Sequence, residues 1–120
     1  MERVIHIDGR DVPFRATAAI PRLYRIKFGR DIMQDMTSIQ KAVEKAQKGQ
    51  GPIPIKLLEI FENVAYLMAR HADPDMKERT VEAWLDSFDT FSIYAVFPEL
   101  MELWRANNQT LATSKKKPTR

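Results

Sequence analysis

The chain has 120 residues, of which 44% are hydrophobic, and this length and composition predict one domain with one core of ordinary size. It contains no cysteine, which excludes disulfides, thiolate metal sites and a thiol nucleophile and favours a reducing compartment. The net charge is +3, but four of the 19 basic residues lie in the last eight positions, so the rest of the chain is close to neutral. We expect a soluble intracellular protein, because the first residues lack the apolar run of a signal peptide and no stretch reaches the roughly 18 apolar residues of a membrane span.

Charge is distributed unevenly along the chain. Residues 1–30 contain seven basic and three acidic side chains, whereas residues 73–102 contain eight acidic and two basic ones. If the fold places these segments on opposite surfaces, copies of the chain attract one another head to tail, and such contacts build rings or open helical assemblies. We therefore expect a homo-oligomer that weakens as salt is added. The residues expected at its charged contacts are Arg22, Arg25, Glu82 and Asp86.

Residues 3–15 predict a β-hairpin. Two runs of strand-forming residues flank an Asp-Gly pair, which is typical of two-residue type I′ turns. This turn places Pro13 opposite Val4 in a non-hydrogen-bonded pair, so the missing N–H of Pro13 blunts the outer edge of the second strand. The outer edge of residues 3–7, around Ile5, is then free to pair with a neighbouring copy or an extended client. The alternative is that this edge is simply solvated.

Helical periodicity follows the hairpin, and we expect about five helices with limits set by glycines, prolines and candidate caps. The first predicted helix begins between Thr17 and Pro21 and ends at Gly29, and the second runs from Thr37 or Ser38 to Lys48. The third occupies about 18 residues beyond Pro54, and the fourth begins at Pro74 with Asp73 as its cap and takes another turn or two around residues 80–88. The fifth covers residues 90–108, with a kink or a restart at Pro98. The sequence thus predicts a single, mainly α domain with a short N-terminal β-hairpin over residues 1–108, followed by a disordered basic tail over residues 109–120.

One polar cluster invites a chemical interpretation. His71, Asp73 and Asp75 in "HADPD" are residue types that ligate divalent metals, and a metal-dependent enzyme built on them is one alternative function. The two aspartates, however, stand where helix caps and first-turn acids belong, and the histidine stands in the last turn of a helix, where positive charge is favoured. We expect no metal site, no cofactor, no catalytic residue and no enzyme.

A second alternative is a small nucleic-acid-binding regulator. The segment "PRLYRIKFGR" at residues 21–30 and the C-terminal tail supply the basic side chains and aromatics that such proteins use. Tyr24 and Phe28 share the apolar stripe of this predicted helix, so packing in the core is their ordinary role. We therefore expect nucleic acid not to be the main partner.

The order of these pieces resembles a known family. The hairpin "VIHIDGRDVPFRAT" is followed by "LYRIKFGRDI" at the end of a helix, and "VEAWLDSFDTFSIYAVFPELMELWRAN" closes the chain before a short polar tail. This arrangement is similar to that of the tail assembly chaperones of long-tailed bacteriophages and prophages of Gram-positive hosts. The resemblance extends from Val4 to about Asn107, and residues 34–54 carry no match.

The resemblance implies a non-catalytic, mostly helical protein. Such chaperones bind the long, helical tape measure protein and keep it soluble while the tail tube polymerises around it, and they leave as tail tube protein replaces them. The implied partners are the tape measure protein, the major tail tube protein as a further candidate, and other copies of the chain, with no membrane. The implied location is the bacterial host cytoplasm and not the mature virion. No family binding motif is fixed enough to be carried over to residues of this chain.

A chaperone of this kind needs an apolar surface to cover a helical client. The candidates are the aromatic residues near the last helices that the core does not need. These client-binding candidates are Trp84, Phe88, Phe91 and Tyr94. The alternative is that all four are buried in the core.

The tail "LATSKKKPTR" suggests a property of the gene. Adjacent lysines near the end of a reading frame are what a run of adenines encodes, and members of the resembled family often make a longer product by frameshifting there. We expect the codons of Lys115–Lys117 to form a slippery heptamer, with this chain as the short product. Interrupted lysine codons, or the absence of an open second frame, would exclude it, and a solubilising basic end is the alternative.

Overall fold

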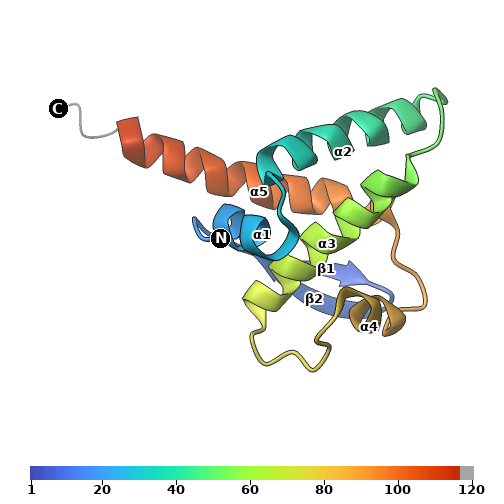
Figure 1. The fold of residues 1–120 in the computed structure, drawn as a ribbon, viewed down its shortest axis with the longest axis horizontal. Coiled ribbons are helices and arrows are strands. Elements are labelled where there is room, and N and C mark those ends of the chain that lie inside the picture. Colours follow the sequence, from blue (N-terminus) through green and yellow to red (C-terminus); the bar gives the residue numbers. More distant parts are fainter. Residues whose placement is uncertain (117–120) are drawn as a thin grey trace.

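The computed structural model describes the backbone of residues 1–116 and the side chains of residues 1–108. A two-stranded hairpin is followed by helices, of which α3 runs through the middle of the molecule (Figure 1). The elements are β1 (Glu2–Ile7), β2 (Arg10–Arg15), α1 (Ile20–Phe28), α2 (Ile32–Gln47), α3 (Ile55–Ala72), α4 (Val81–Asp86) and α5 (Ile93–Lys116). The predicted fold class, mainly α with a short N-terminal hairpin, is confirmed.

The hairpin has the predicted turn and register. Asp8 and Gly9 both have positive φ, 54° and 76°, as a type I′ turn requires, and Val4 lies opposite Pro13. Met1 and Ala16 exchange two backbone hydrogen bonds of 3.0 and 2.9 Å. Because hydrogen-bonded and non-hydrogen-bonded pairs alternate, the Val4–Pro13 pair is a non-hydrogen-bonded one. The apolar face of the hairpin lies against α3 and α5.

The central helix α3 is buried on nearly all sides over its second half. Residues 64–69 are six consecutive buried positions, which is the burial pattern of a helix surrounded by other elements. It packs against β2, α1, α2, α4 and α5. The long helical period in the sequence located this helix correctly, because nearly every turn of it contributes to the core.

Helix α2 begins at Ile32, five residues before the predicted start. Asp31 is its N-cap and accepts a hydrogen bond of 2.9 Å from the Met33 N–H. The prediction began at Thr37 because Gln34 and Asp35 interrupt the apolar period. The structure buries Asp35 nonetheless, since side chains outside α2 satisfy its oxygens.

The predicted helix beginning at Pro74 is not present. Asp73 instead ends α3, with its N–H donating to the Ala69 carbonyl at 3.0 Å, and a turn follows in which the Met76 N–H donates to the Asp73 carbonyl. The next helix, α4, begins after Thr80, whose hydroxyl oxygen accepts from the Ala83 N–H at 3.0 Å. The hydroxyl cap at Thr80 therefore sets this boundary, and the proline at 74 does not.

Helix α5 runs through Pro98 to Lys116 as one helix, so of the kink or restart predicted there, the restart does not occur. The helix thus extends beyond residue 108, where we expected the domain to end and a disordered tail to begin. No glycine or proline interrupts the sequence between Pro98 and Pro118, so no strong helix breaker stands at the predicted end. The rest of the predicted tail, residues 117–120, lies outside the described residues.

Candidate functional site

An open groove of about 750 Å³ lies between α2 and α5. In Figure 1, α2 lies above α5. The residues that line the groove on α2 are Met36, Thr37, Gln40, Lys41 and Glu44, and those on α5 are Met101, Trp104, Arg105 and Asn108. A groove bounded by two helices is a geometry that accommodates a third helix.

The floor of the groove is apolar and adaptable. Met36, Met101 and Trp104 form it, and each is less than a tenth exposed. Met33 lies one turn before Met36 on α2, is 55% exposed, and has its sulfur 3.9 Å from the Asn108 side-chain nitrogen. Methionine side chains are unbranched and polarizable, so they adjust to ligands of irregular shape. The groove therefore offers an apolar strip that leads outward to Met33.

The walls of the groove are polar. Gln40 donates a hydrogen bond of 2.6 Å to Glu44 on the α2 side. Lys41 on α2 and Arg105 on α5 line the two walls, and neither forms an ion pair with another described residue. A ligand in the groove would thus contact apolar side chains below, and two cations and the Glu44 carboxylate at the sides.

A buried carboxylate fixes the start of α2 and with it the position of Met33 and Met36. Asp35 accepts a 2.6 Å hydrogen bond from the Tyr24 hydroxyl and two from the Arg30 guanidinium, at 2.8 and 2.9 Å. Burial by itself would raise the pKa of Asp35, but the hydrogen bonds from Arg30 and Tyr24 outweigh burial and lower it. Burial and the neighbouring carboxylate raise the pKa of Tyr24, so it stays a hydrogen-bond donor.

The four aromatic residues predicted to bind a client do not form one surface. Trp84 and Phe88 are buried, Phe91 is half-buried against the core, and only Tyr94 is exposed, at 48%. The ring centroids of Trp84, Phe88 and Phe91 lie 5.2–5.5 Å apart. The prediction of a surface is therefore wrong for Trp84 and Phe88, and the alternative that all four are buried is wrong for Tyr94.

The predicted self-association residues are partly available. Arg22 and Arg25 are exposed on α1, and Glu82 and Asp86 are exposed on α4. Ile5 is only 5% exposed, and its backbone lies in a pair hydrogen-bonded to β2, because hydrogen-bonded pairs fall at the odd positions of β1. Ile5 therefore cannot pair with a neighbour, and only the even positions of β1 present their backbone outward.

The cluster "HADPD" does not converge on one point. His71 Nε2 lies 2.9 Å from the Thr17 hydroxyl, and burial, Arg15 and the N-terminal amine lower the His71 pKa. Within the described part of the chain, no group of three or more histidine and carboxylate side chains is arranged to hold a metal ion. A search of the same residues found no helix long and apolar enough to span a membrane.

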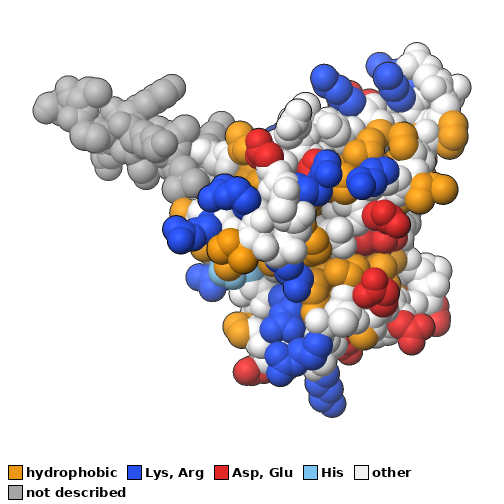
Figure 2. Space-filling model, in the orientation of Figure 1, with side chains coloured by type: hydrophobic (Ala, Val, Ile, Leu, Met, Phe, Trp, Pro, Cys, Tyr) orange, Lys and Arg blue, Asp and Glu red, His pale blue; other side chains and the backbone are white. Residues whose placement is uncertain are grey.

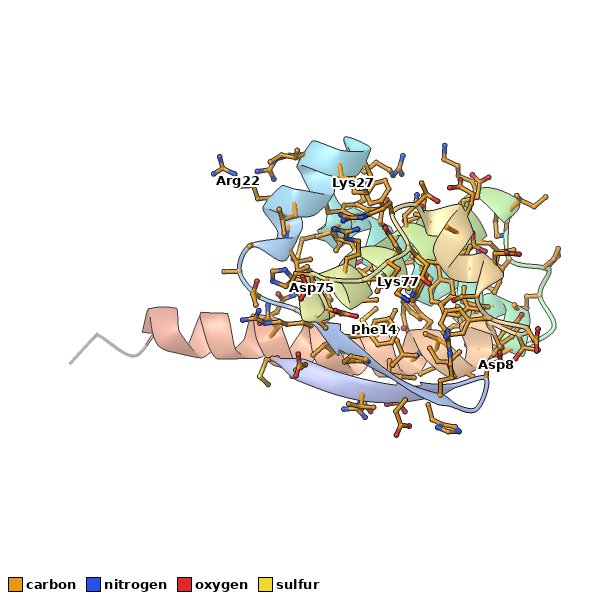
Figure 3. The ribbon with its side chains drawn as sticks, turned by 90° about the horizontal axis from the view of Figure 1, so that it is seen from below. Asp8, Phe14, Arg22, Lys27, Asp75 and Lys77 are labelled. Atoms are coloured by element: carbon orange, nitrogen blue, oxygen red, sulfur yellow. The ribbon has the colours of Figure 1, made fainter. Side chains whose placement is uncertain are left out.

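The basic segment of α1 exposes cations but not aromatics. Tyr24 is fully buried, and Phe28 is half-buried with its ring 5.2 Å from that of Tyr24. Arg30 is held by Asp35. Figure 3 places Arg22 and Lys27 on α1, well away from the hairpin turn at Asp8. The rings are therefore not available to stack on bases, as nucleic-acid recognition through this helix would need.

Comparisons with known proteins add no relative to these observations. No family model matches the chain, and no match was found among curated proteins or solved structures. The fold and the site define a small helical domain with an N-terminal hairpin and a methionine-floored groove between α2 and α5.

Sequence reasoning missed the groove. The last predicted helix, residues 90–108, contains Met101 and Trp104, but the predicted helices leave Met33 and Met36 outside. The signal that could have included them is Asp31, an N-cap residue type directly before "IMQDM" and two residues after the helix-ending Gly29.

Proposed function

We propose that this protein is a tail assembly chaperone of a long-tailed phage or prophage, which binds the tape measure protein and keeps it soluble during tail tube assembly. The observation that carries the proposal is the order of the segments "VIHIDGRDVPFRAT", "LYRIKFGRDI" and "VEAWLDSFDTFSIYAVFPELMELWRAN" along the chain. A mainly helical domain with an N-terminal hairpin agrees with what that resemblance implies. The proposed place of action is the bacterial host cytoplasm.

The groove between α2 and α5 is the proposed client site. Tape measure proteins are long and helical, so an amphipathic client helix would cover its apolar stripe by laying it in a groove. Met36, Met101 and Trp104 provide the apolar floor, and Met33 extends it. Lys41 and Arg105 favour a client helix with acidic residues beside its apolar stripe. Replacement of the chaperone by major tail tube protein would release this stripe to the tube.

Co-expression with fragments of the tape measure protein tests the function. The fragments are expected to be soluble with the chaperone and to aggregate without it, measured as the soluble fraction of the fragment after centrifugation. Fragments that are equally soluble without this protein would show that it is not their chaperone. Gene position gives an independent test, since we expect the gene between those of the major tail protein and a very long tape measure protein.

A matched pair of variants tests the groove. Met33→Asp places a charge on an exposed residue beside the groove, one turn before Met36 and next to the lining residue Asn108, and Tyr94→Ser alters an exposed residue away from the groove. Met33→Asp is expected to reduce the soluble fraction of the fragment severalfold, because a charge would be desolvated against the client's apolar stripe. Tyr94→Ser is expected to leave it unchanged. A loss with Tyr94→Ser and none with Met33→Asp would place the client elsewhere.

A further inference from the structure

A small open pocket lies between the first helix and the end of the central helix. It has a volume of about 230 Å³, and the residues that line it are Leu23 on α1, Leu67, Arg70 and His71 on α3, and Pro74 just after α3. Most small-molecule sites have volumes of roughly 300–1,000 Å³, so this pocket suits a ligand no larger than one apolar side chain with one polar group. We refer to these five residues as the Arg70 pocket.

Three of the lining residues are apolar. Leu67 belongs to the core and is 8% exposed, whereas Leu23 is 37% exposed and Pro74 is also exposed. The apolar part of the lining therefore continues from the core to the surface. A small aliphatic group that lies against it loses contact with water, which favours its binding.

Arg70 supplies a cation whose hydrogen-bonding capacity is mostly unused. Its side chain is half-buried, and one guanidinium nitrogen donates to the Tyr66 hydroxyl at 3.5 Å. The Tyr66 hydroxyl in turn donates to the Glu78 carbonyl at 2.8 Å. Arg70 makes no other side-chain hydrogen bond and no ion pair with a described residue. Because a guanidinium has five N–H donors in a planar fork, Arg70 can hold a carboxylate at two points.

His71 adds a hydrogen-bond donor without a second charge. Burial, then Arg15 and the N-terminal amine, lower its pKa, so the ring is neutral at neutral pH. Its Nε2 lies 2.9 Å from the Thr17 hydroxyl. When Nε2 accepts the hydroxyl proton, the ring hydrogen is on Nδ1, and Nδ1 makes no hydrogen bond with a described residue. The lining thus contains an unused N–H donor next to the cation.

The charge around the pocket favours a ligand with one negative charge. No acidic side chain lines it, since Asp73 and Asp75, which flank Pro74 in the sequence, are outside the lining. In Figure 2, Lys and Arg side chains gather over α1 and the lower-left end of α3, with hydrophobic side chains between them. One lining cation beside a neutral imidazole balances the single charge of a carboxylate, but not the nearly double charge of a phosphate group.

We propose that the Arg70 pocket binds a carboxylate that carries one branched aliphatic group, with the carboxylate on the two polar lining residues and the aliphatic group on the three apolar ones. Such a ligand is a free short-chain acid or the C-terminal residue of a polypeptide that ends in leucine, isoleucine or valine. The Arg70 pocket shares no lining residue with the groove between α2 and α5, so this inference does not depend on the proposed function.

Proton NMR of the histidine rings tests the proposal, because the chain has two histidines and one of them lines the pocket. The probes are 4-methylpentanoate for a free acid and N-acetylleucine for a chain end, each titrated at constant neutral pH. The His71 ring signals are expected to shift and saturate, whereas those of His6, which is 70% exposed on the hairpin, are expected to stay in place. The probe that binds more tightly identifies the source of the ligand.

Two further probes test the chemistry of the ligand. N-acetylleucinamide keeps the aliphatic group but has no carboxylate, and inorganic phosphate has charge but no aliphatic group. Both are expected to bind at least about tenfold more weakly than the better acid, because hydrogen bonds to a charged group are lost in the first case and apolar contact in the second. A His71 signal that moves with neither acid, or that responds as strongly to the amide or to phosphate, overturns the proposal.

Matched variants test the two parts of the pocket. Arg70→Gln is expected to weaken binding by about tenfold or more, whereas Arg25→Gln, at an exposed residue outside the lining, is expected to change it by less than about twofold. Leu23→Ala is expected to weaken binding severalfold and Ile26→Ala, outside the lining, to leave it unchanged. Circular dichroism checks that helix content is retained. A folded Arg70→Gln variant that binds like the wild type, or equal losses with Leu23→Ala and Ile26→Ala, would exclude this site.

Discussion

At the scale of single residues, one buried carboxylate links the first two helices. Asp35 on α2 is 3% exposed and receives hydrogen bonds from Tyr24 on α1 and from Arg30 in the connection between the helices. An aspartate in this position would be costly without those donors. With them it sets the angle at which α2 leaves α1, and so the place of Met36 in the groove and of Met33 beside it.

We predict that Asp35→Asn lowers the free energy of unfolding by about 2 kcal/mol at neutral pH, because hydrogen bonds to a charged group contribute more than neutral ones. The folded state lowers the pKa of Asp35 below 3.8, so its contribution is present above that pH and is lost as pH falls through the folded-state value. Urea unfolding at several pH values measures both effects. Asp75→Asn, at an exposed residue without a hydrogen-bonded partner, is the control, and an equal loss in both variants would contradict the prediction.

At the scale of elements, side-chain contacts in the connections decide how neighbouring segments are joined. Thr17, between β2 and α1, accepts from the Ala19 N–H at 3.2 Å and lies 2.9 Å from His71 Nε2 at the end of α3. A neutral His71 can accept the Thr17 hydroxyl proton at this nitrogen, whereas a protonated ring cannot. A protonated ring can donate to the Thr17 oxygen instead, so the contact ties the start of α1 to the central helix in either protonation state.

We predict that acid weakens the protein through His71. Burial, then Arg15 and the N-terminal amine, lower its pKa below 6.5, so the unfolded chain binds the proton more readily than the folded one. The free energy of unfolding is expected to be highest above pH 6.5 and to fall as pH drops through 6.5 toward the folded-state pKa. His71→Gln is expected to remove part of this slope in chemical denaturation between about pH 7.5 and pH 5. An unchanged slope would assign the effect to other groups.

At the scale of the whole molecule, Trp84 connects elements that are distant in sequence. Its ring lies 6.3 Å from that of Phe14 on β2, 5.7 Å from that of Tyr66 on α3, and 5.2 Å from those of Phe88 and Phe91. Helix α4 has only six residues and is too short to be stable alone. Trp84 therefore holds α4 on the hairpin and the central helix.

We predict that Trp84→Ala lowers the free energy of unfolding by about 3–5 kcal/mol, because it removes a large ring and leaves a cavity among four others. Tyr94→Ala, in an exposed residue of the same predicted aromatic set, is expected to change it by less than about 0.5 kcal/mol. Thermal and urea unfolding measure both. Similar small losses in the two variants would mean that Trp84 is not a core residue.

Local physics let the sequence alone predict most of the elements. The Asp-Gly pair predicted the turn and register of the hairpin, because the two positive φ angles it favours allow one register. The period of apolar residues predicted α3, because nearly every turn of this helix contributes side chains to the core. The first residues of α2 and α4 were harder to predict from the sequence, because Asp31 and Thr80 became N-caps only through backbone geometry that no residue type guarantees.

Only the tertiary structure decided which side chains are available at the surface. Trp84, Phe88 and Tyr94 look alike in the sequence, yet two are buried and one is exposed. The hairpin and α3 cover Trp84, and Arg10 of the hairpin lies over the Phe88 ring. The groove joins α2 to α5, and Asp35 finds its donors outside its own helix. Periodicity reports the preference of one element for burial on one face, but what covers that face depends on packing between segments far apart in the chain.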